Sequence, residues 1–261
     1  MKLISLNTWG GKLHKPLLQF VGDQSLSTDI FCFQEVFDSP VTQFRSDMKT
    51  DLYSDLKKTL KNFKAFYAPM FTGYDTEVKV DFPLSFGQAT FVKKDVGIVN
   101  EETVFIHGKF DYKPEVFLEG IEDALDLPRN MQIVKIKLGK KEILIGNLHG
   151  YWRPGPKVDS QQSIDQSKRI IKTLNKFDGP KIICGDFNLN LSTKSLAILE
   201  KSLENLVRKF KIPTTRSHHY KKTSEKFADY MFASKEVKVK SFSVPTVVVS
   251  DHLPLILEFS A

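Results

Sequence analysis

The stretch Ile-Ile-Cys-Gly-Asp-Phe-Asn at residues 182–188 begins as an apolar run and ends in an acid and an amide. Such an ending is typical of a buried strand in an α/β fold, where the polar residues after the strand often carry the chemistry. The C-terminal region repeats the pattern, because Val247–Val249 leads directly into Ser250-Asp251-His252. A single ending of this kind is more often the cap of a strand. Its meaning therefore depends on whether other strands end in the same way.

Three further apolar runs stop at polar side chains. They cover residues 3–6, 30–33 and 144–146, and the polar residues that follow are Asn7, Gln34, Glu35, Asn147 and His149. Carboxylates do not gather in a protein without a cation to offset their repulsion. If the five endings converge, Glu35, Asp186 and Asp251 surround such a cation. Their oxygen ligands suit Mg²⁺, Mn²⁺ or Ca²⁺ rather than zinc.

The polar residues beside this predicted cation favour hydrolysis of a phosphate ester. A metal, the imidazoles of His149 and His252 and a carboxylate suit the attack of water on phosphorus, because the metal offsets charge on the phosphoryl oxygens. Asp186 is a candidate to orient or deprotonate the water. Asn188 would hydrogen-bond the phosphate without repelling it. Asp229 would hold His252 in the required tautomer, as the acid does in a serine triad.

The alternation of apolar runs and helical stripes predicts two packed sheets flanked by helices. Strands are expected at 2–6, 30–35, 86–92, 131–138, 142–149, 181–184, 230–232, 237–244 and 255–259. Residues 131–138 and 142–149 should form a hairpin. Apolar residues recur at helical spacing in residues 52–60, 164–177 and 196–210, which predicts a helix in each segment. Long loops are expected at 69–86 and 109–128, and such loops often wall a functional site.

Length and composition limit the number of domains and the class of protein. A chain of 261 residues without a linker or repeat is expected to form one domain over residues 1–261. The net charge of +7 would suit a polyanionic partner, but with only six arginines the basic residues are mostly lysine, which favours a solvated surface. Cys32 and Cys184 lie in apolar runs and are expected to be buried thiols. No apolar run is long enough for a membrane span, and a cytoplasmic location is expected.

Taken together, these residues resemble the endonuclease/exonuclease/phosphatase superfamily. The matching elements occur in the family's order along nearly the whole chain. They are Asn7 with Trp9, Gln34-Glu35, Asn147-x-His149, Gly185-Asp186-Phe187-Asn188, Asp229-Tyr230 and Ser250-Asp251-His252. The resemblance implies a four-layer α/β sandwich, in which helices flank two central, mostly antiparallel sheets.

The resemblance also implies a role for each residue of the site. Glu35 would be the principal metal ligand, assisted directly or through water by Asn7 and Asp251. The implied catalytic residues are His149, Asp186, Asn188, Asp229 and His252. Arg129 matches a position where some relatives place a phosphate-binding arginine. The implied cofactor is Mg²⁺, with Mn²⁺ as an alternative.

Three more side chains are candidates for substrate contact. Trp152 and Arg153 follow His149, and an aromatic residue beside an arginine can stack a base or a sugar. Trp152 would equally serve to pack its loop against the helix that follows. Arg216 lies in the basic, aromatic segment 216–222 and is a candidate to meet a phosphate.

The sequence does not identify the substrate. The first hypothesis is a magnesium-dependent phosphodiesterase, most simply a nuclease acting on nucleic acid or nucleotides. The second is a phosphatase of the same fold that acts on a small or lipid-linked phosphate ester. The third is a catalytically silent binding module. His149-Gly150-Tyr151-Trp152 departs from the segment of abasic-site endonucleases and has some likeness to deadenylase-type members of the superfamily.

Overall fold

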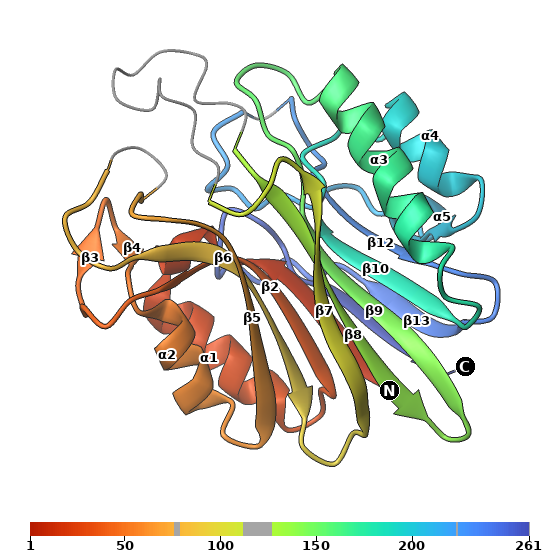
Figure 1. The fold of residues 1–261 in the computed structure, drawn as a ribbon, viewed down its shortest axis with the longest axis horizontal. Coiled ribbons are helices and arrows are strands. Elements are labelled where there is room, and N and C mark those ends of the chain that lie inside the picture. Colours follow the sequence, from red (N-terminus) through yellow and green to blue (C-terminus); the bar gives the residue numbers. More distant parts are fainter. Residues whose placement is uncertain (76–78, 112–126, 223, 261) are drawn as a thin grey trace.

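The computed structural model describes residues 1–75, 79–111, 127–222 and 224–260. Two six-stranded sheets form its centre (Figure 1). The first has the order β13 (Lys238–Ser243), β14 (Leu255–Ser260), β1 (Lys2–Asn7), β2 (Ile30–Asp38), β6 (Ser85–Lys93), β5 (Phe63–Thr72). The second has the order β11 (Glu204–Asn205), β12 (Asp229–Ala233), β10 (Lys181–Asp186), β9 (Lys141–His149), β8 (Arg129–Leu138), β7 (Ile98–His107). Only β1 with β2 and β9 with β10 pair in parallel; the other pairs in these two sheets are antiparallel.

Helices cover the outer face of each sheet. Helices α1 (His14–Ser25) and α2 (Leu52–Thr59) pack on the first sheet, where Leu17, Val21 and Leu56 join its apolar residues in one buried cluster. The second sheet carries α3 (Gln161–Leu174), α4 (Lys194–Glu200) and α5 (Leu206–Lys209). The predicted four-layer α/β sandwich is therefore confirmed. A small hairpin of β3 (Phe44–Arg45) and β4 (Met48–Lys49) lies outside the two sheets.

Buried amides join the two sheets directly. The Nδ2 of Asn147 on β9 lies 3.2 Å from the backbone oxygens of both Phe33 and Ala89 on the first sheet. Gln34 Nε2 donates to Asn147 Oδ1 at 2.7 Å, and Gln88 Nε2 donates to the backbone oxygen of Asn147 at 2.8 Å. Buried polar groups need such partners, and the contacts fix how the sheets lie on one another. Gln34 and Asn147 therefore hold the fold together, although both belong to polar strand endings.

The apolar stripe at 196–210 was expected to be one helix, and this expectation was wrong. The chain forms α4, then pairs Glu204 and Asn205 with β12 as β11, and then forms α5. The Oδ1 of Asn205 accepts from the backbone N–H of Arg208 and so caps the second helix. Both helices bury the same side of the stripe, so the apolar spacing alone does not reveal the break.

Other local expectations also need correction. Val247–Val249 is irregular rather than a strand, and Val247 is 39% exposed. The expected loop at 69–86 begins inside β5 and ends inside β6. Most of the loop expected at 109–128 lies outside the described residues. Helix α1 and strands β5 and β7 were not predicted.

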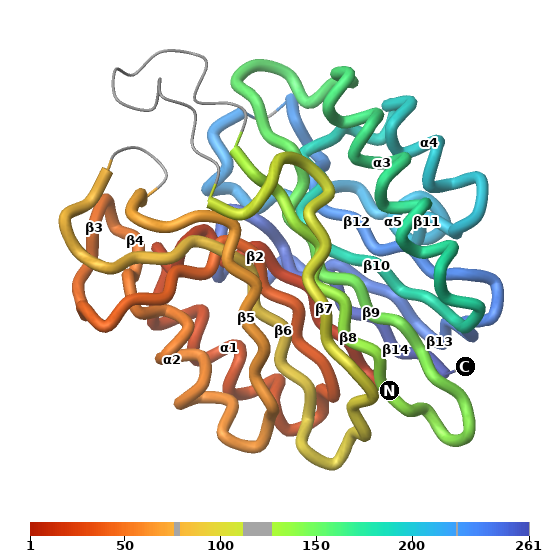
Figure 2. The backbone as a smooth tube through the Cα atoms, viewed as in Figure 1, coloured from red at the N-terminus to blue at the C-terminus, as the bar shows by residue number. Residues whose placement is uncertain are grey.

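Two expectations from composition can be compared with the structure. Cys32 and Cys184 are buried free thiols, as expected. Within the described part of the chain, no helix has the length and apolar character needed to cross a bilayer. Figure 2 shows the two termini side by side, and the amino group of Met1 donates to the backbone oxygen of Phe259 at 2.8 Å.

Candidate active site

The strand pairing brings the polar endings to one edge of the sandwich. Parallel neighbours finish at the same edge of a sheet, so Asn7 on β1 lies opposite Gln34 on β2. By the same pairing, Asp186 on β10 lies opposite His149 on β9. Strand β12 runs the other way and begins at this edge, where Asp229 pairs with Asp186. Four of the five predicted endings thus meet in space, and residues 250–252 complete the group.

An irregular backbone directs Glu35 toward this edge. Strand β2 changes its register with β6 between Phe33 and Val36, and Glu35 has a φ of +55°. A bulge of this kind re-aims a side chain that regular alternation would send elsewhere. The hydroxyl of buried Thr8 lies 2.9 Å from the backbone oxygens of both Gln34 and Glu35. Thr8 therefore holds the bulge in place.

Glu35 and Asp186 converge on one point. The Nδ2 of Asn7 donates to Glu35 Oε1 at 2.9 Å and to Asp186 Oδ2 at 3.1 Å, while Asn7 Oδ1 accepts from the backbone N–H of Trp9. One amide group thus lies where two carboxylates face each other. Burial raises the pKa of Glu35, and the negative charge of Asp251 raises it further. A hard divalent cation would offset both effects and prefers these oxygen ligands, so the donor set fits such an ion.

Asp186 is held in place by its neighbours. Its Oδ1 accepts from the backbone N–H of Asn188 at 2.8 Å, and Asn188 adopts a φ of +55° to make this contact. Burial raises the pKa of Asp186, but the positive charges of His252 and Lys157 outweigh it and hold the pKa below its usual range. The group is therefore a fixed carboxylate at neutral pH.

His252 is tied to Asp229 on one side and to Arg216 on the other. Its Nδ1 lies 2.8 Å from both carboxylate oxygens of Asp229, as the sequence predicts. Burial and Arg216 lower the pKa of His252, whereas Asp229 and Asp251 raise it, and the net shift is upward. Arg216 Nη1 contacts Nε2 of the same ring, so Asp229 and Arg216 together fix the position of the imidazole.

His149 and Arg129 occupy the opposite wall. Burial, followed by the charge of Arg129, holds the pKa of His149 well below its usual range, so the ring is neutral. His149 Nε2 lies 3.8 Å from Glu35 Oε1 and 4.0 Å from Asp186 Oδ2, beyond direct hydrogen bonding. Arg129 is only 5% exposed, and its Nε and Nη1 have no hydrogen-bond partner among the described residues. Burial lowers the pKa of Arg129 to about 10, which leaves it cationic at neutral pH.

These residues line a cleft of about 380 Å³. Trp9, Trp152 and Tyr220 form its walls, and the guanidinium carbon of Arg216 lies 4.0 Å from the centre of the Tyr220 ring. A second part of the lining is apolar and comes from Met48, Phe71, Phe86 and Leu127. Trp152 is 43% exposed, so it is free to contact a ligand at the mouth.

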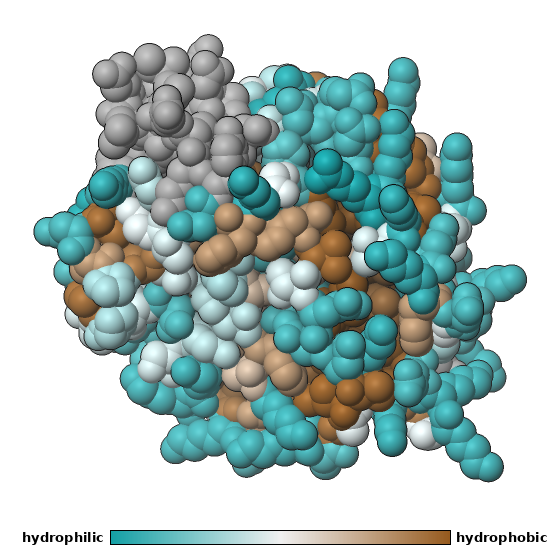
Figure 3. Space-filling model, in the orientation of Figure 1, coloured by the Kyte–Doolittle hydropathy of each residue, from teal (hydrophilic) through white to brown (hydrophobic). Residues whose placement is uncertain are grey.

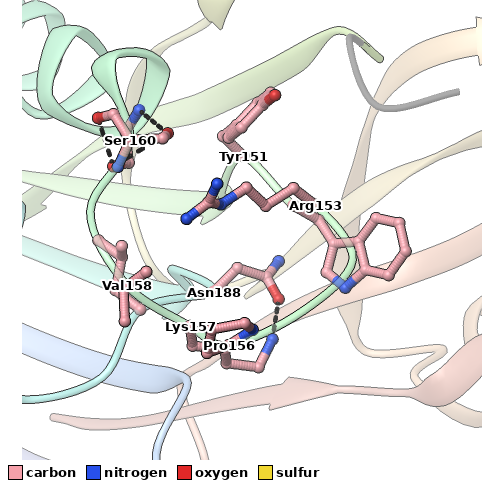
Figure 4. Close-up of a pocket in the computed structure, with 10 residues that line it drawn as sticks. Tyr151, Arg153, Pro156, Lys157, Val158, Ser160 and Asn188 are labelled. Atoms are coloured by element: carbon pink, nitrogen blue, oxygen red, sulfur yellow. Dashed lines mark hydrogen bonds between the residues drawn. The ribbon is translucent and has the colours of Figure 1, made fainter. Parts of the chain in front are cut away.

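One predicted substrate-binding residue lies elsewhere. Arg153 lines a separate small cavity, where its side chain runs between Tyr151 and Asn188 rather than into the cleft (Figure 4). Its Nη2 lies 3.5 Å from the backbone oxygen of Asp159. Arg153 therefore does not line the cleft, although Trp152, Lys157 and Asn188 line both cavities.

The sequence reasoning also missed two cations, Lys12 and Lys157, which both line the cleft. Neither is part of a strand ending or an apolar pattern. Hydrophilic side chains lie along most of the outline of the molecule in Figure 3. Among the described lysines only Lys49 and Lys157 are buried, so most lysines are in contact with solvent, as predicted.

Comparisons with known proteins agree with this geometry. The sequence model of the endonuclease/exonuclease/phosphatase family matches residues 4–252. A protein of this family from Bacteroides vulgatus superposes with a TM-score of 0.70 at 17% identity, covering 99% of this chain and 98% of its own. A mannosyl-6-phosphatase from Bacteroides thetaiotaomicron gives a TM-score of 0.69 at 20% identity, with full coverage of both chains.

The human Nocturnin catalytic domain, whose structure holds a sulfate anion, gives a TM-score of 0.68 at 18% identity and covers 100% of this chain and 93% of its own. None of the curated proteins matches this sequence. At these identities the solved structures show a shared fold, whereas the family match extends over nearly the whole chain and includes every predicted strand ending. The chain belongs to the endonuclease/exonuclease/phosphatase family, whose members are hydrolases of phosphate esters.

Proposed function

We propose that this protein is a hydrolase of phosphate esters that depends on a divalent cation, with Mg²⁺ preferred and Mn²⁺ as an alternative. The observation that carries the proposal is the convergence of Glu35 and Asp186 on Asn7, in a cleft that is also lined by Arg129, whose Nε and Nη1 have no partner among the described residues. The carboxylates of Glu35 and Asp186 need a metal cation, and the buried guanidinium of Arg129 needs an anion. A phosphate bound to a divalent metal ion would satisfy both needs in one cleft.

Glu35 would hold the cation, with Asp186 and Asp251 contributing directly or through water. The cation would polarise the phosphoryl oxygens and offset the charge that develops on them. Asn7 does not present its oxygen to this point, because Trp9 donates to it. Its role in this arrangement is to keep the carboxylates of Glu35 and Asp186 apart and oriented.

Asp186 orients the attacking water. A carboxylate with a depressed pKa is a weak base, so alignment of the water contributes more than removal of its proton. The Nε2 of His252 lies 3.7 Å from Asp186 Oδ2, which places the imidazole beside the same water or phosphate oxygen. Asp229 keeps that ring in the orientation that turns Nε2 toward the cleft.

The remaining donors stabilise the phosphate as bonds form and break. Neutral His149, Asn188 and Arg129 all line the cleft. Donors fixed in advance cost little reorganisation during the reaction, which is why they are effective in a buried site. Arg216 would exchange its contact with His252 for a phosphate oxygen when substrate arrives.

Two substrate classes remain candidates. A cleft of about 380 Å³ with aromatic walls has the size of a small-molecule site, which favours the phosphatase hypothesis or an enzyme that takes the end of a chain. The exposed face of Trp152 supports the nuclease hypothesis, because it offers a stacking surface for a base. A silent binding module is the weakest candidate, since all the catalytic residues predicted from the sequence are present at one edge.

Removal of divalent cations tests this function. The protein, dialysed against EDTA, should hydrolyse neither p-nitrophenyl phosphate nor bis-(p-nitrophenyl) phosphate, and added Mg²⁺ should restore release of nitrophenolate from at least one of them. Added Ca²⁺ serves as a comparison of a larger ion with the same charge. Hydrolysis that continues at an unchanged rate in EDTA would contradict the proposal, as would the absence of hydrolysis in the presence of Mg²⁺ and Mn²⁺.

A further inference from the structure

Lys157 is a buried cation with an unusual position. It lies in the loop between β9 and α3, is 9% exposed, and lines the same cleft as Asp186. Its Nζ donates to Asn188 Oδ1 at 2.6 Å (Figure 4). A lysine only donates, so this contact turns the Asn188 oxygen toward Lys157, while Asn188 Nδ2 donates to the backbone oxygen of Gly150 at 3.3 Å.

The ammonium group of Lys157 is incompletely partnered. It carries three N–H groups, and the bond to Asn188 is its only hydrogen bond among the described residues. A buried charge is costly unless it is paired with an opposite charge and hydrogen-bonded. The Asn188 oxygen is neutral, so it does not satisfy this need. Lys157 lines the cleft, and a phosphate oxygen bound beside it would supply both the opposite charge and a further acceptor.

The net charge of the residues that line the cleft also favours a bound phosphate. Lys12, Arg129, Lys157 and Arg216 bring four positive charges, whereas Glu35, Asp186 and Asp251 bring three negative ones. Asp229 lies behind the cleft, paired with His252. A divalent cation raises the positive excess from one to three. A phosphate monoester, which carries two negative charges, neutralises that excess more completely than a phosphodiester, which carries one.

We infer that the cleft selects phosphate monoesters and that Lys157 is the residue that provides this selectivity. Lys157 supplies the extra positive charge and donors for the third non-bridging oxygen that a monoester has and a diester lacks. It also orients Asn188, but that contribution is common to both kinds of ester. The inference rests on the proposed function for the position of the phosphate, and it names the class of substrate that the proposed function leaves open.

Binding of inorganic phosphate tests the inference without turnover. Titration calorimetry with Mg²⁺ present should show inorganic phosphate binding roughly 10- to 100-fold more weakly to Lys157→Met than to the unaltered protein, since a hydrogen bond to a charged group is lost. Dimethyl phosphate, a diester, should change its affinity much less. Lys157→Arg keeps the charge and should retain most of the preference for phosphate. Lys172→Met, on the exposed side of α3, is the matched control for the loss of one positive charge.

Kinetics provide the second measurement. The ratio of kcat/KM for p-nitrophenyl phosphate to that for bis-(p-nitrophenyl) phosphate should fall about 10-fold or more in Lys157→Met and stay constant in Lys172→Met. Equal losses on both esters, or no loss of phosphate binding in a Lys157→Met protein that unfolds at the normal temperature, would overturn the inference. A protein that hydrolyses neither ester defeats the proposed function instead, and the binding comparison still tests Lys157.

Discussion

Replacement of Asp186 by asparagine is expected to lower kcat by about 10³-fold or more, whichever phosphate ester is used. Asparagine keeps the size of the side chain and the hydrogen bond from the Asn188 backbone, but it removes the negative charge. The water then loses the acceptor that aligns it, and the cation loses one of the converging carboxylates. Steady-state hydrolysis of p-nitrophenyl phosphate, with Mg²⁺ varied at each substrate concentration, separates the two losses.

The fold of this variant needs an independent check. Asp165→Asn removes a carboxylate from the exposed side of α3 and should keep the rate and the metal dependence of the unaltered protein. Thermal unfolding should show that both variants are folded at the assay temperature. Asp186 would have no catalytic role if Asp186→Asn were folded and hydrolysed the ester at the rate of the control.

Gly185→Ala is expected to have the largest effect on stability. Gly185 has a φ of +140°, and a Cβ added there would lie 1.9 Å from the backbone oxygen of Leu148 on the neighbouring strand. Strands β9 and β10 would have to separate at the Gly185–Leu148 pair, next to the pair formed by Asp186 and His149. We expect a loss of roughly 3–5 kcal/mol in the free energy of unfolding, seen as a fall of about 10 °C in Tm by circular dichroism.

Gly139→Ala is the matched comparison for Gly185→Ala. Gly139 has a φ of +63°, and a Cβ there would meet nothing within 4 Å, so only the cost of the left-handed backbone remains, about 1–2 kcal/mol. The difference between the two variants measures the close approach of β9 to β10. Equal Tm values would mean that this approach contributes nothing to stability.

The convergence of the candidate site residues was predictable because they repeat one simple pattern. Each strand ending joins an apolar run, which pairing buries, to a polar residue, which the sheet edge exposes to the cleft, as for Glu35 and Asp186. Gln34 and Asn147 share the pattern but point between the sheets. The side to which a residue points depends on strand register, and in β2 the register changes at a bulge that no sequence period reveals.

The other residues that line the cleft were harder to predict. Lys157 lies in a loop rich in proline and glycine, where no apolar repeat indicates which side chains turn inward. Arg153, four positions earlier, looks equally suited to a phosphate and lies outside the cleft. The helix break at residues 204–205 was not predicted either, because it results from the pairing of these residues with β12, which is distant in the sequence. Contacts between residues distant in the sequence fix both Lys157, through Asn188, and the helix break.

The anchoring of the loop that carries Trp152 and Lys157 has a consequence for how the enzyme can change. At its start, the backbone N–H of Gly150 donates to the oxygen of Asp186 at 2.6 Å. At its end, the carboxylate of Asp159 accepts from the backbone N–H groups at the start of α4. Between these anchors the loop is tied down again at Tyr151 and at Lys157. Substitutions at its exposed positions, such as Trp152, are therefore expected to change which ligands bind without moving the strand endings.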